Sequence, residues 1–544
     1  MKPEKILRCV ILNVSLFLFC FCVAAKPPII IVNKGYQLII NQDKGTIESF
    51  QAISDGKNDE LLIPRHGQLP LFKVEFMNDD LKFQTLTATD AKKITVNKIV
   101  KNWGDSVILD FEQIGGMNAN ARVVIRCPKA TPLTYWSMEL DNPGSLWIGH
   151  IQFPVVEIPF DENPTGENSG RILHSLYDGV LLGPIKPGMV AGGWRASRRN
   201  APEIWRSTNY PRECTVQMMA YYKPEAGLYI ACEDPAGTPK LIAPMLEPDG
   251  VTMGIGHYPG TQGPGKTKIP YEVVLGTFKG DWHSAASIYR DWAEKQPFCS
   301  RKLSERKDHP GWLLNPVVGA TFPMRGQGDW DPPAKVNPEY APATNALPYL
   351  DNLSKAFDAP LMPIIFNWEN AGPWVQPEAF PPVGGKSKMQ EFMKKAKAKG
   401  WHPVLYGNGI NWVVAQKNTG YDGMPYFKAH GGDSAVTRSW SGAAPRPSVG
   451  WRSLFNTCVA TPAARRMILG MTKGMAELGP DVIQQFDQGV GAVACYANNH
   501  GHAPVPGPWM TTAFKSLLQE DNEVARCRDI VPCAGRHKPA SPPR

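Results

Sequence analysis

The first half of the chain alternates apolar and polar residues over short stretches, the pattern of half-buried β-strands. Such stretches lie at 29–32, 36–40, 46–50, 106–111, 121–126, 228–231 and 271–275. Gly45 follows the second stretch and can supply the positive φ that a tight turn between antiparallel strands requires. Many short strands separated by turn residues predict a β-sandwich over residues 26–279.

The apolar period changes from two to that of a helix after the last of these strands. Trp282, Ala285, Ala286, Tyr289 and Trp292 recur at helical spacing. We expect an amphipathic helix here, within a junction over residues 280–308 that leads to the second domain.

Short apolar runs alternate with helical patterns beyond His309. The runs lie at 316–320, 361–366, 403–406 and 482–486, and helices are expected over 389–399, 461–478 and 508–528. Thr461 is expected to cap its helix, with Pro462 at the first helical position. Repeated β/α units predict a parallel sheet of the TIM-barrel type over residues 309–530.

That barrel is expected to be incomplete. Four units are evident and part of a fifth, whereas a closed barrel needs eight over roughly 250 residues. Residues 531–544 are small, basic and proline-rich, without a pattern. Two interpretations stay open for this tail: a disordered terminus, or a reading frame that ended or shifted within a larger gene.

Residues 1–25 carry a basic start, an apolar run and a Val23-Ala24-Ala25 cleavage site, as a signal peptide does. The sequence therefore predicts a secreted or periplasmic protein with no membrane partner after cleavage. A membrane anchor is the alternative, although the apolar run is short for a span.

Charge and cysteine content exclude some function classes. The net charge is +8, mostly from the signal segment and the tail, so the body gives no reason to expect a nucleic-acid partner. Of the 11 cysteines, three leave with the signal segment and none of the others forms a Cys-x-x-Cys pair, which disfavours a zinc ribbon.

Polar and aromatic residues follow four consecutive predicted strands of the second domain. They are Thr321, Phe322 and Arg325, then Asn367, Trp368, Glu369, Asn370 and Trp374, then Asn408, Asn411 and Trp412, and last Asp487. Aromatic faces beside amide, carboxylate and guanidinium groups suit a sugar, and strand ends build barrel active sites. A structural plug of aromatic side chains at the barrel mouth is the alternative. We expect substrate contacts from Asn367, Trp368, Glu369, Asn408 and Trp412.

Asp487 is the strongest candidate for catalysis, since a carboxylate that ends a buried strand can act as a glycosyl nucleophile. Its position alone is equally consistent with a helix cap or an arginine partner. His500 and His502 follow it, and hydrogen bonds to substrate are expected of both. Metal ligation is the alternative, but the sequence shows no further ligand, so neither a metal nor another cofactor is predicted.

A phosphate-binding motif match at residues 260–267 is rejected. The loop of that motif must end at a helix N-terminus, whereas Pro270 and a β-pattern follow here. A glycine-rich hairpin explains the segment better.

Three segments resemble a bacterial glycoside-hydrolase-like family that is distantly similar to endo-α-N-acetylgalactosaminidases and the α-galactosidase superfamily. They are MMAYYKPEAGLYIACED at 218–234, GDWHSAASIYRDW at 280–292 and FDQGVGAVACYANNHGH at 486–502. The resemblance implies a β-sandwich before a catalytic barrel and hydrolysis of α-glycosides with retention, with Asp487 as the nucleophile. It also implies an acid/base glutamate further along, but Glu520 and Glu523 lie within a predicted helix and are expected to face solvent or cap a turn.

The sequence thus predicts an exported glycoside hydrolase-like protein acting on an oligosaccharide or glycan. The chain is expected to be impaired in hydrolysis if the acid/base is missing. A non-catalytic carbohydrate-binding protein is the alternative, and a surface protein without sugar affinity is the third hypothesis.

Overall fold

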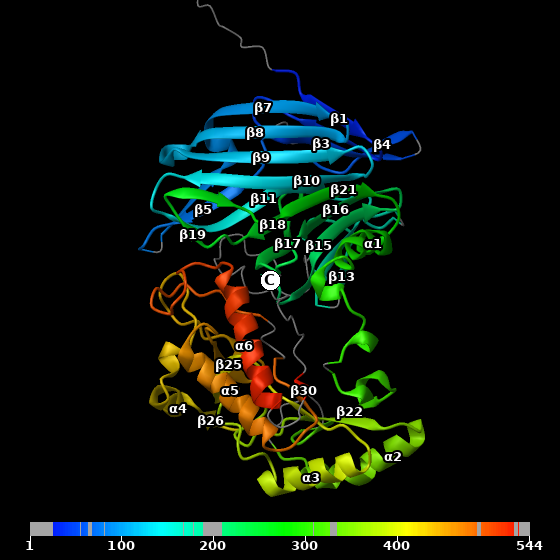
Figure 1. Ribbon diagram of the computed structural model, residues 1–544, viewed down its shortest axis with the longest axis vertical. Helices are drawn as coiled ribbons and strands as arrows, with labels where there is room; N and C mark the ends of the chain where they lie inside the picture. The colour runs from blue at the N-terminus through cyan, green and yellow to red at the C-terminus, as the bar shows by residue number, and fades with distance from the viewer. Residues whose placement is uncertain are drawn as a thin grey trace, which may run out of the picture.

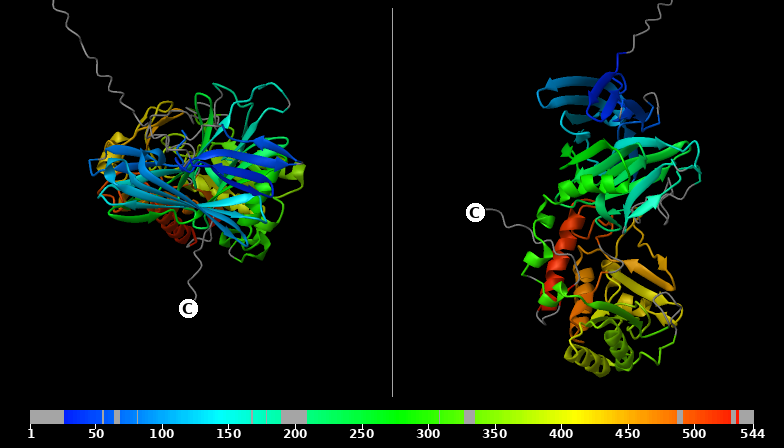
Figure 2. Two further views of the ribbon diagram at one scale, coloured as in Figure 1. Left: turned by 90° about the horizontal axis from the view of Figure 1, so that it is seen from above. Right: turned by 90° about the vertical axis from the view of Figure 1, so that its right-hand side faces the viewer.

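The computed structural model describes residues 26–54, 56–63, 68–80, 82–166, 168–177, 179–188, 209–307, 309–326, 335–486, 491–526 and 531–532. A β-rich N-terminal part stands above a C-terminal part in which strands and helices alternate (Figures 1 and 2).

Antiparallel sheets build the N-terminal part. A four-stranded sheet contains β1 (Ile29–Asn33), β2 (Tyr36–Ile40), β3 (Ile47–Ser54) and β4 (Lys57–Glu60). The ten-stranded sheet runs in the order β13 (Val180–Leu182), β12 (Arg171–Leu176), β15 (Cys214–Lys223), β16 (Ala226–Glu233), β21 (Glu272–Phe278), β10 (Leu133–Asn142), β9 (Ala119–Pro128), β8 (Gly104–Ile114) and β7 (Ala91–Lys101), with β20 (Gly265–Lys268) on β10. The seven-stranded sheet runs β14 (Asn209–Tyr210), β17 (Lys240–Leu246), β18 (Gly250–His257), β11 (Trp147–Pro159), β5 (Lys73–Met77) and β6 (Phe83–Thr87), with β19 (Thr261–Gln262) on β11.

The two large sheets share one apolar core, as in a β-sandwich. Trp136 of β10 lies edge-on to Phe153 of β11 with ring centroids 6.4 Å apart, and both side chains are fully buried. Gly45 has φ +61°, as the predicted turn requires. The rejected phosphate motif spans β19 and β20, and a strand, β21, follows it instead of a helix. The predicted hairpin is wrong, because β19 pairs with β11 and β20 with β10, in different sheets.

The predicted junction helix is α1 (Trp282–Ala293). Asp281 caps its N-terminus, because the Asp281 side chain accepts a hydrogen bond from the His283 amide. Its buried residues Ala285, Tyr289 and Ala293 pack with residues of β15 and β16 on the ten-stranded sheet. The helix therefore covers a face of the sandwich.

Parallel strands and helices alternate in the C-terminal part, as predicted. The sheet runs in chain order through β22 (Val318–Pro323), β23 (Leu361–Phe366), β24 (Val404–Tyr406), β29 (Val482–Gln484) and β30 (Val531–Pro532). The connecting helices are α2 (Leu347–Phe357), α3 (Lys386–Ala398), α5 (Pro462–Ala476) and α6 (Trp509–Arg526). The capping prediction for α5 is confirmed, because the Thr461 side chain accepts from the Ala464 amide.

The predicted incomplete TIM-type barrel is not confirmed. Within the described residues this sheet has five strands and two edges, at β22 and β30. β30 lies at the start of the segment that the sequence predicts to be irregular.

The sequence pattern gave no sign of a small antiparallel sheet between β24 and α5. It contains β26 (Tyr421–Asp422), β25 (Asn411–Gln416), β28 (Arg452–Asn456) and β27 (Ser448–Val449), and α4 (Met424–Ala429) lies beside β25. Asn411 and Trp412, expected in the loop after the third parallel strand, are instead part of this added sheet.

Two sets of contacts join the C-terminal part to the sandwich. Tyr496 and Val505 share a buried apolar cluster with Met77 of β5. On α6, the Lys515 ammonium and the Thr511 hydroxyl each donate to a backbone carbonyl of the loop before β17, both at 2.9 Å. Residues 491–508 and α6 therefore dock against the sandwich.

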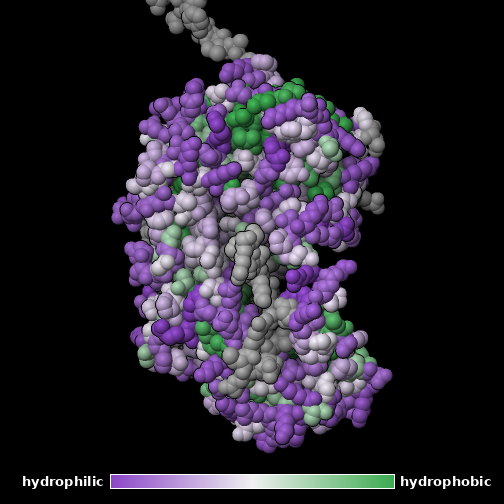
Figure 3. Space-filling view, in the orientation of Figure 1, coloured by the Kyte–Doolittle hydropathy of each residue, from purple (hydrophilic) through white to green (hydrophobic). Residues whose placement is uncertain are grey.

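The surface in Figure 3 is mostly hydrophilic, with a hydrophobic area near the N-terminal end. None of the helices in the described ranges is both long and apolar enough to cross a membrane. The predicted signal peptide lies outside the described residues.

Candidate functional site

The carboxyl ends of the parallel strands bring together the polar residues that the sequence singled out. Arg325 follows β22, Asn367 and Glu369 follow β23, and Asn408 follows β24. Asn408 forms an isolated antiparallel bridge with Phe486, the residue directly before Asp487. Asp487 itself lies outside the described residues, so its predicted role stays a prediction.

Hydrogen bonds connect these strand ends to one another. The Asn367 amide donates to the Arg325 carbonyl at 3.3 Å, and the Arg325 guanidinium donates to the Asn370 carbonyl at 2.7 Å. The Asn408 amide donates to the Trp374 carbonyl at 2.9 Å. These bonds fix the loop after β23 against its two neighbours.

Two residues of that loop have a left-handed backbone. Asn367 has φ +56° and Trp374 has φ +62°. Positive φ is uncommon for residues other than glycine and is found disproportionately at functional sites. The backbone therefore supports a binding role for this strand edge, independently of the side-chain chemistry.

Arg452 belongs to the site, although the sequence did not indicate it. It lies on β28 and donates to the Asn408 side-chain oxygen at 3.3 Å, with its guanidinium 5.7 Å from the centre of the Trp374 ring. No pattern in the sequence indicates Arg452, because this residue lies more than 40 residues after the start of β24 and the added antiparallel sheet carries it into the site.

Glu369 is a buried acid at the centre of this arrangement, with 2 % of its surface exposed. Burial raises the pKa of its carboxyl to about 7, although two backbone hydrogen bonds and the positive charges of Arg452 and Arg325 lower it. Among the described residues, its Oε2 has no hydrogen-bond partner. Buried polar atoms rarely lack a partner, so this oxygen is a place where a water molecule or a ligand hydroxyl can donate a hydrogen bond.

We expect Glu369→Gln to be more stable than the wild type at pH 8 and nearly equal to it near pH 4. The folded-state pKa of Glu369 lies above the usual 4.5, so the folded protein holds a proton that the unfolded chain releases. The contribution of Glu369 to the free energy of unfolding therefore falls as the pH rises from about 4.5 through about 7, by up to about 3 kcal/mol.

Urea unfolding of both proteins across this pH range measures the difference, with the exposed Glu339→Gln as control. A difference between wild type and Glu369→Gln that does not change with pH would contradict the assignment.

The two tryptophans expected to stack on sugar are interior residues. Trp368 has no exposed surface, packs against Phe380 and donates its indole N–H to the Tyr406 carbonyl at 2.8 Å. Trp412 is 2 % exposed and packs edge-on to Phe427. Neither presents a ring face to solvent.

The two glutamates of the predicted last helix differ in environment. Glu520 lies on α6 and accepts from Arg465 of α5 and from Ser516, so it links the helices, whereas Glu523 is exposed. The Glu520 side chain is nevertheless 40 % exposed, so the expectation that these glutamates face solvent fits both of them. The sequence did not indicate the neighbouring acid Asp521. Burial raises the pKa of its carboxyl to about 6, and the carboxylate accepts a hydrogen bond from the Thr472 hydroxyl.

His500 and His502 lie with two cysteines, which corrects the expectation that no further metal ligand exists. Cys458, Cys495 and the two histidines offer ligand atoms that all lie within 4.8 Å of one another. Hydrogen bonds from Cys458, His500 and His502 lower the pKa of the Cys495 thiol against the effect of burial. Cys458 is separated from the others by more than 35 residues, so no spacing motif indicates it.

Comparisons with known proteins support the resemblance. Residues 267–528 match a family described as a domain of unknown function, DUF6259. A Bacteroides thetaiotaomicron protein described as "Putative glycoside hydrolase" is 23 % identical over 496 residues, 89 % of this chain and 62 % of that protein. The chain thus spans less than two thirds of the length of this curated relative.

Solved structures show the same fold. The α-N-acetylgalactosaminidase NagBb of Bifidobacterium bifidum, in complex with Gal-NHAc-DNJ, matches with a TM-score of 0.61 at 13 % identity, over 93 % of this chain and 75 % of that one. Its complex with GalNAc matches with a TM-score of 0.59 at 13 % identity, over 93 % and 76 %. The chain is therefore glycoside hydrolase-like in fold, and the resemblance seen in the sequence is confirmed.

Proposed function

We propose that the chain is the sandwich and part of the β/α barrel of an exported α-glycosidase. It hydrolyses an α-linked sugar of a glycan with retention, and Asp487 is the nucleophile. N-acetylgalactosamine is the first sugar to test, because the solved relatives are α-N-acetylgalactosaminidases.

The buried Glu369 carries this proposal. Its unpartnered Oε2 lies at the carboxyl edge of a parallel sheet, and the neighbouring charges are Arg325 and Arg452. A sugar hydroxyl can donate to this carboxylate while its own oxygen accepts from a guanidinium, which is how polar groups orient a ligand in a pocket. Asn408 lies in the same network and bonds to Arg452.

The experiment is hydrolysis of nitrophenyl α-glycosides by the purified chain, with N-acetylgalactosamine, galactose and glucose as the sugars. Proton NMR of the first product anomer determines the stereochemistry. Release of the α-anomer from one of these sugars supports the proposal. Release of the β-anomer contradicts the retaining mechanism.

A non-catalytic sugar-binding protein is the second candidate function. It is favoured by the glutamates of α6, because Glu520 pairs with Arg465 of α5 and Glu523 is exposed on the same helix, so neither ends a strand of the parallel sheet. Calorimetric titration with the same sugars distinguishes the two. Binding that Asp487→Ala leaves intact, without hydrolysis by the wild type, supports the binding protein.

A further inference from the structure

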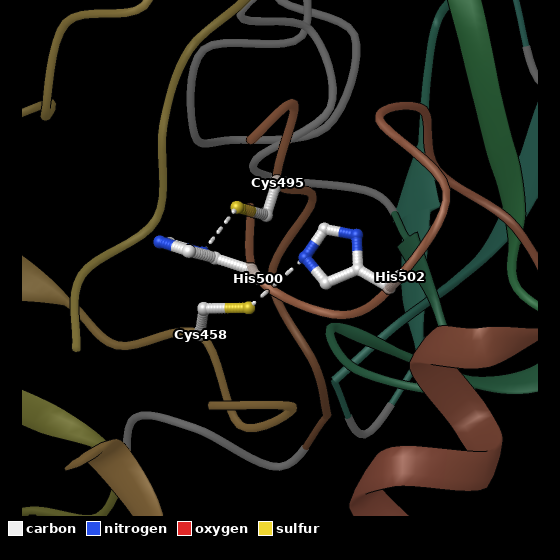
Figure 4. A group of neighbouring side chains, drawn as sticks. All are labelled: Cys458, Cys495, His500 and His502. Carbon is white, nitrogen blue, oxygen red and sulfur yellow. Dashed lines mark hydrogen bonds between the residues drawn. The ribbon is translucent and has the colours of Figure 1, made fainter. Parts of the chain in front are cut away.

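A cluster of two cysteines and two histidines shares no residue with the proposed sugar site. Cys458 comes two residues after β28, and the other three residues belong to the connection between β29 and α6. Figure 4 shows the four side chains converging from these two segments, with their sulfur and nitrogen atoms facing one another.

The ligand atoms are already close to the spacing of a tetrahedral zinc site. Cys458 Sγ lies 3.3 Å from His502 Nε2, and Cys495 Sγ lies 3.4 Å from His500 Nδ1. Zinc–sulfur and zinc–nitrogen bonds of ordinary length place such pairs about 3.6 Å apart at the tetrahedral angle. All the other pairs lie within 4.8 Å, so a small contraction completes the tetrahedron.

Contacts around the cluster prepare two of the side chains for metal binding. His502 Nδ1 donates to the Ala503 carbonyl at 2.7 Å, which leaves the Nε2 lone pair directed at the cluster. The His502 ring stacks on Trp509 at 3.7 Å, and the Arg438 amide donates to Cys495 Sγ at 3.4 Å. Such outer contacts orient the ligands in metal sites and strengthen them.

The cluster is largely buried, with His502 partly exposed, and it supplies four protein ligands. Cys458 is 1 % exposed, Cys495 is fully buried and His500 is 9 % exposed. Catalytic zinc sites keep a position open for water, whereas four protein ligands characterise structural sites. Two thiolates and two imidazoles favour zinc over calcium or magnesium, which prefer oxygen ligands.

We propose that Cys458, Cys495, His500 and His502 bind one structural zinc ion. The ion fastens the connection between β29 and α6 to the end of β28. It thereby stabilises residues 491–508, and it holds Tyr496 and Val505 against Met77 of the sandwich. This role does not depend on the proposed hydrolase activity.

A disulfide between Cys458 and Cys495 is the competing arrangement, because the chain is predicted to be exported. It would involve the two sulfurs without using either histidine.

The test begins with the wild-type chain, purified without chelators. Its metal content is measured by inductively coupled plasma mass spectrometry. We expect one zinc per chain, released when a mercurial reagent modifies the thiols. After the zinc is exchanged for cobalt, we expect the visible bands of a tetrahedral site and a thiolate charge-transfer band. These measurements need no variant that could fail to fold.

Substitution then identifies the ligands. We expect Cys458→Ser and Cys495→Ser to lose the zinc, and His500→Ala and His502→Ala to bind it at least tenfold more weakly. Cys299→Ser and His430→Ala are matched controls outside the cluster and should keep one zinc per chain. Limited proteolysis of the zinc-free wild type should cut first within residues 491–508.

Two outcomes would overturn the proposal. One is a chain without stoichiometric metal in which peptide mapping before reduction finds Cys458 joined to Cys495. The other is zinc retained in full by both serine variants. Neither outcome bears on hydrolysis, so this test and that of the proposed function fail separately.

Discussion

Replacing Asp487 by asparagine is expected to lower the rate of α-glycoside hydrolysis by about 10⁴-fold, the scale seen when one member of a catalytic group is removed. Asparagine has nearly the same shape but cannot form the glycosyl–enzyme ester at a useful rate. The measurement is kcat/KM on the nitrophenyl glycoside that the wild type hydrolyses best.

A second variant shows whether Asp487 acts as a nucleophile or only supports the fold. Asp487→Gly should regain activity when azide is added, because the small anion can attack from the vacated side. The product should be the β-glycosyl azide, opposite in configuration to the substrate.

Asp358→Asn is the control, since Asp358 has φ +49° at the end of α2, a conformation that asparagine also adopts. An Asp487→Asn enzyme with unchanged kcat/KM would refute the assignment.

Replacing Trp368 by alanine is expected to lower the free energy of unfolding by about 3–5 kcal/mol. The side chain is fully buried and its N–H bonds to the Tyr406 carbonyl, so the variant loses packing and one buried hydrogen bond. Urea unfolding measures the change. A sugar platform would behave differently, with reduced sugar affinity and little change in stability.

Trp103→Ala is the matched control. Trp103 is 41 % exposed between β7 and β8 and contacts Lys101, so its loss should cost less than about 1 kcal/mol. Equal stability of Trp368→Ala and the wild type would show that the interior placement of Trp368 is wrong.

The part of the site that could be predicted consists of residues that directly follow a predicted strand. Asn367, Glu369 and Asn408 each follow a strand whose apolar run is evident in the sequence. Because the carboxyl ends of parallel strands meet at one edge, these residues lie together as expected. Glu369 was predicted as a substrate contact, but its raised pKa was not, since burial depends on residues distant in sequence.

By itself, the sequence determined the local elements. The alternation at residues 36–40 specifies a strand, and Thr461 with Pro462 specifies the start of α5, because both signals act over a few neighbouring residues. It also determined the β/α order of the C-terminal part and the glycoside hydrolase-like resemblance.

Tertiary structure decided what depends on contacts across the chain. An aromatic residue after a strand can stack on sugar or fill the core, and only the packing of Phe380 shows that Trp368 is interior. Likewise, Cys458 approaches His502 only because the end of β28 and the connection before α6 meet in space. Spacing motifs report neighbours along the chain, whereas the contact between Cys458 and His502 joins residues more than 40 positions apart.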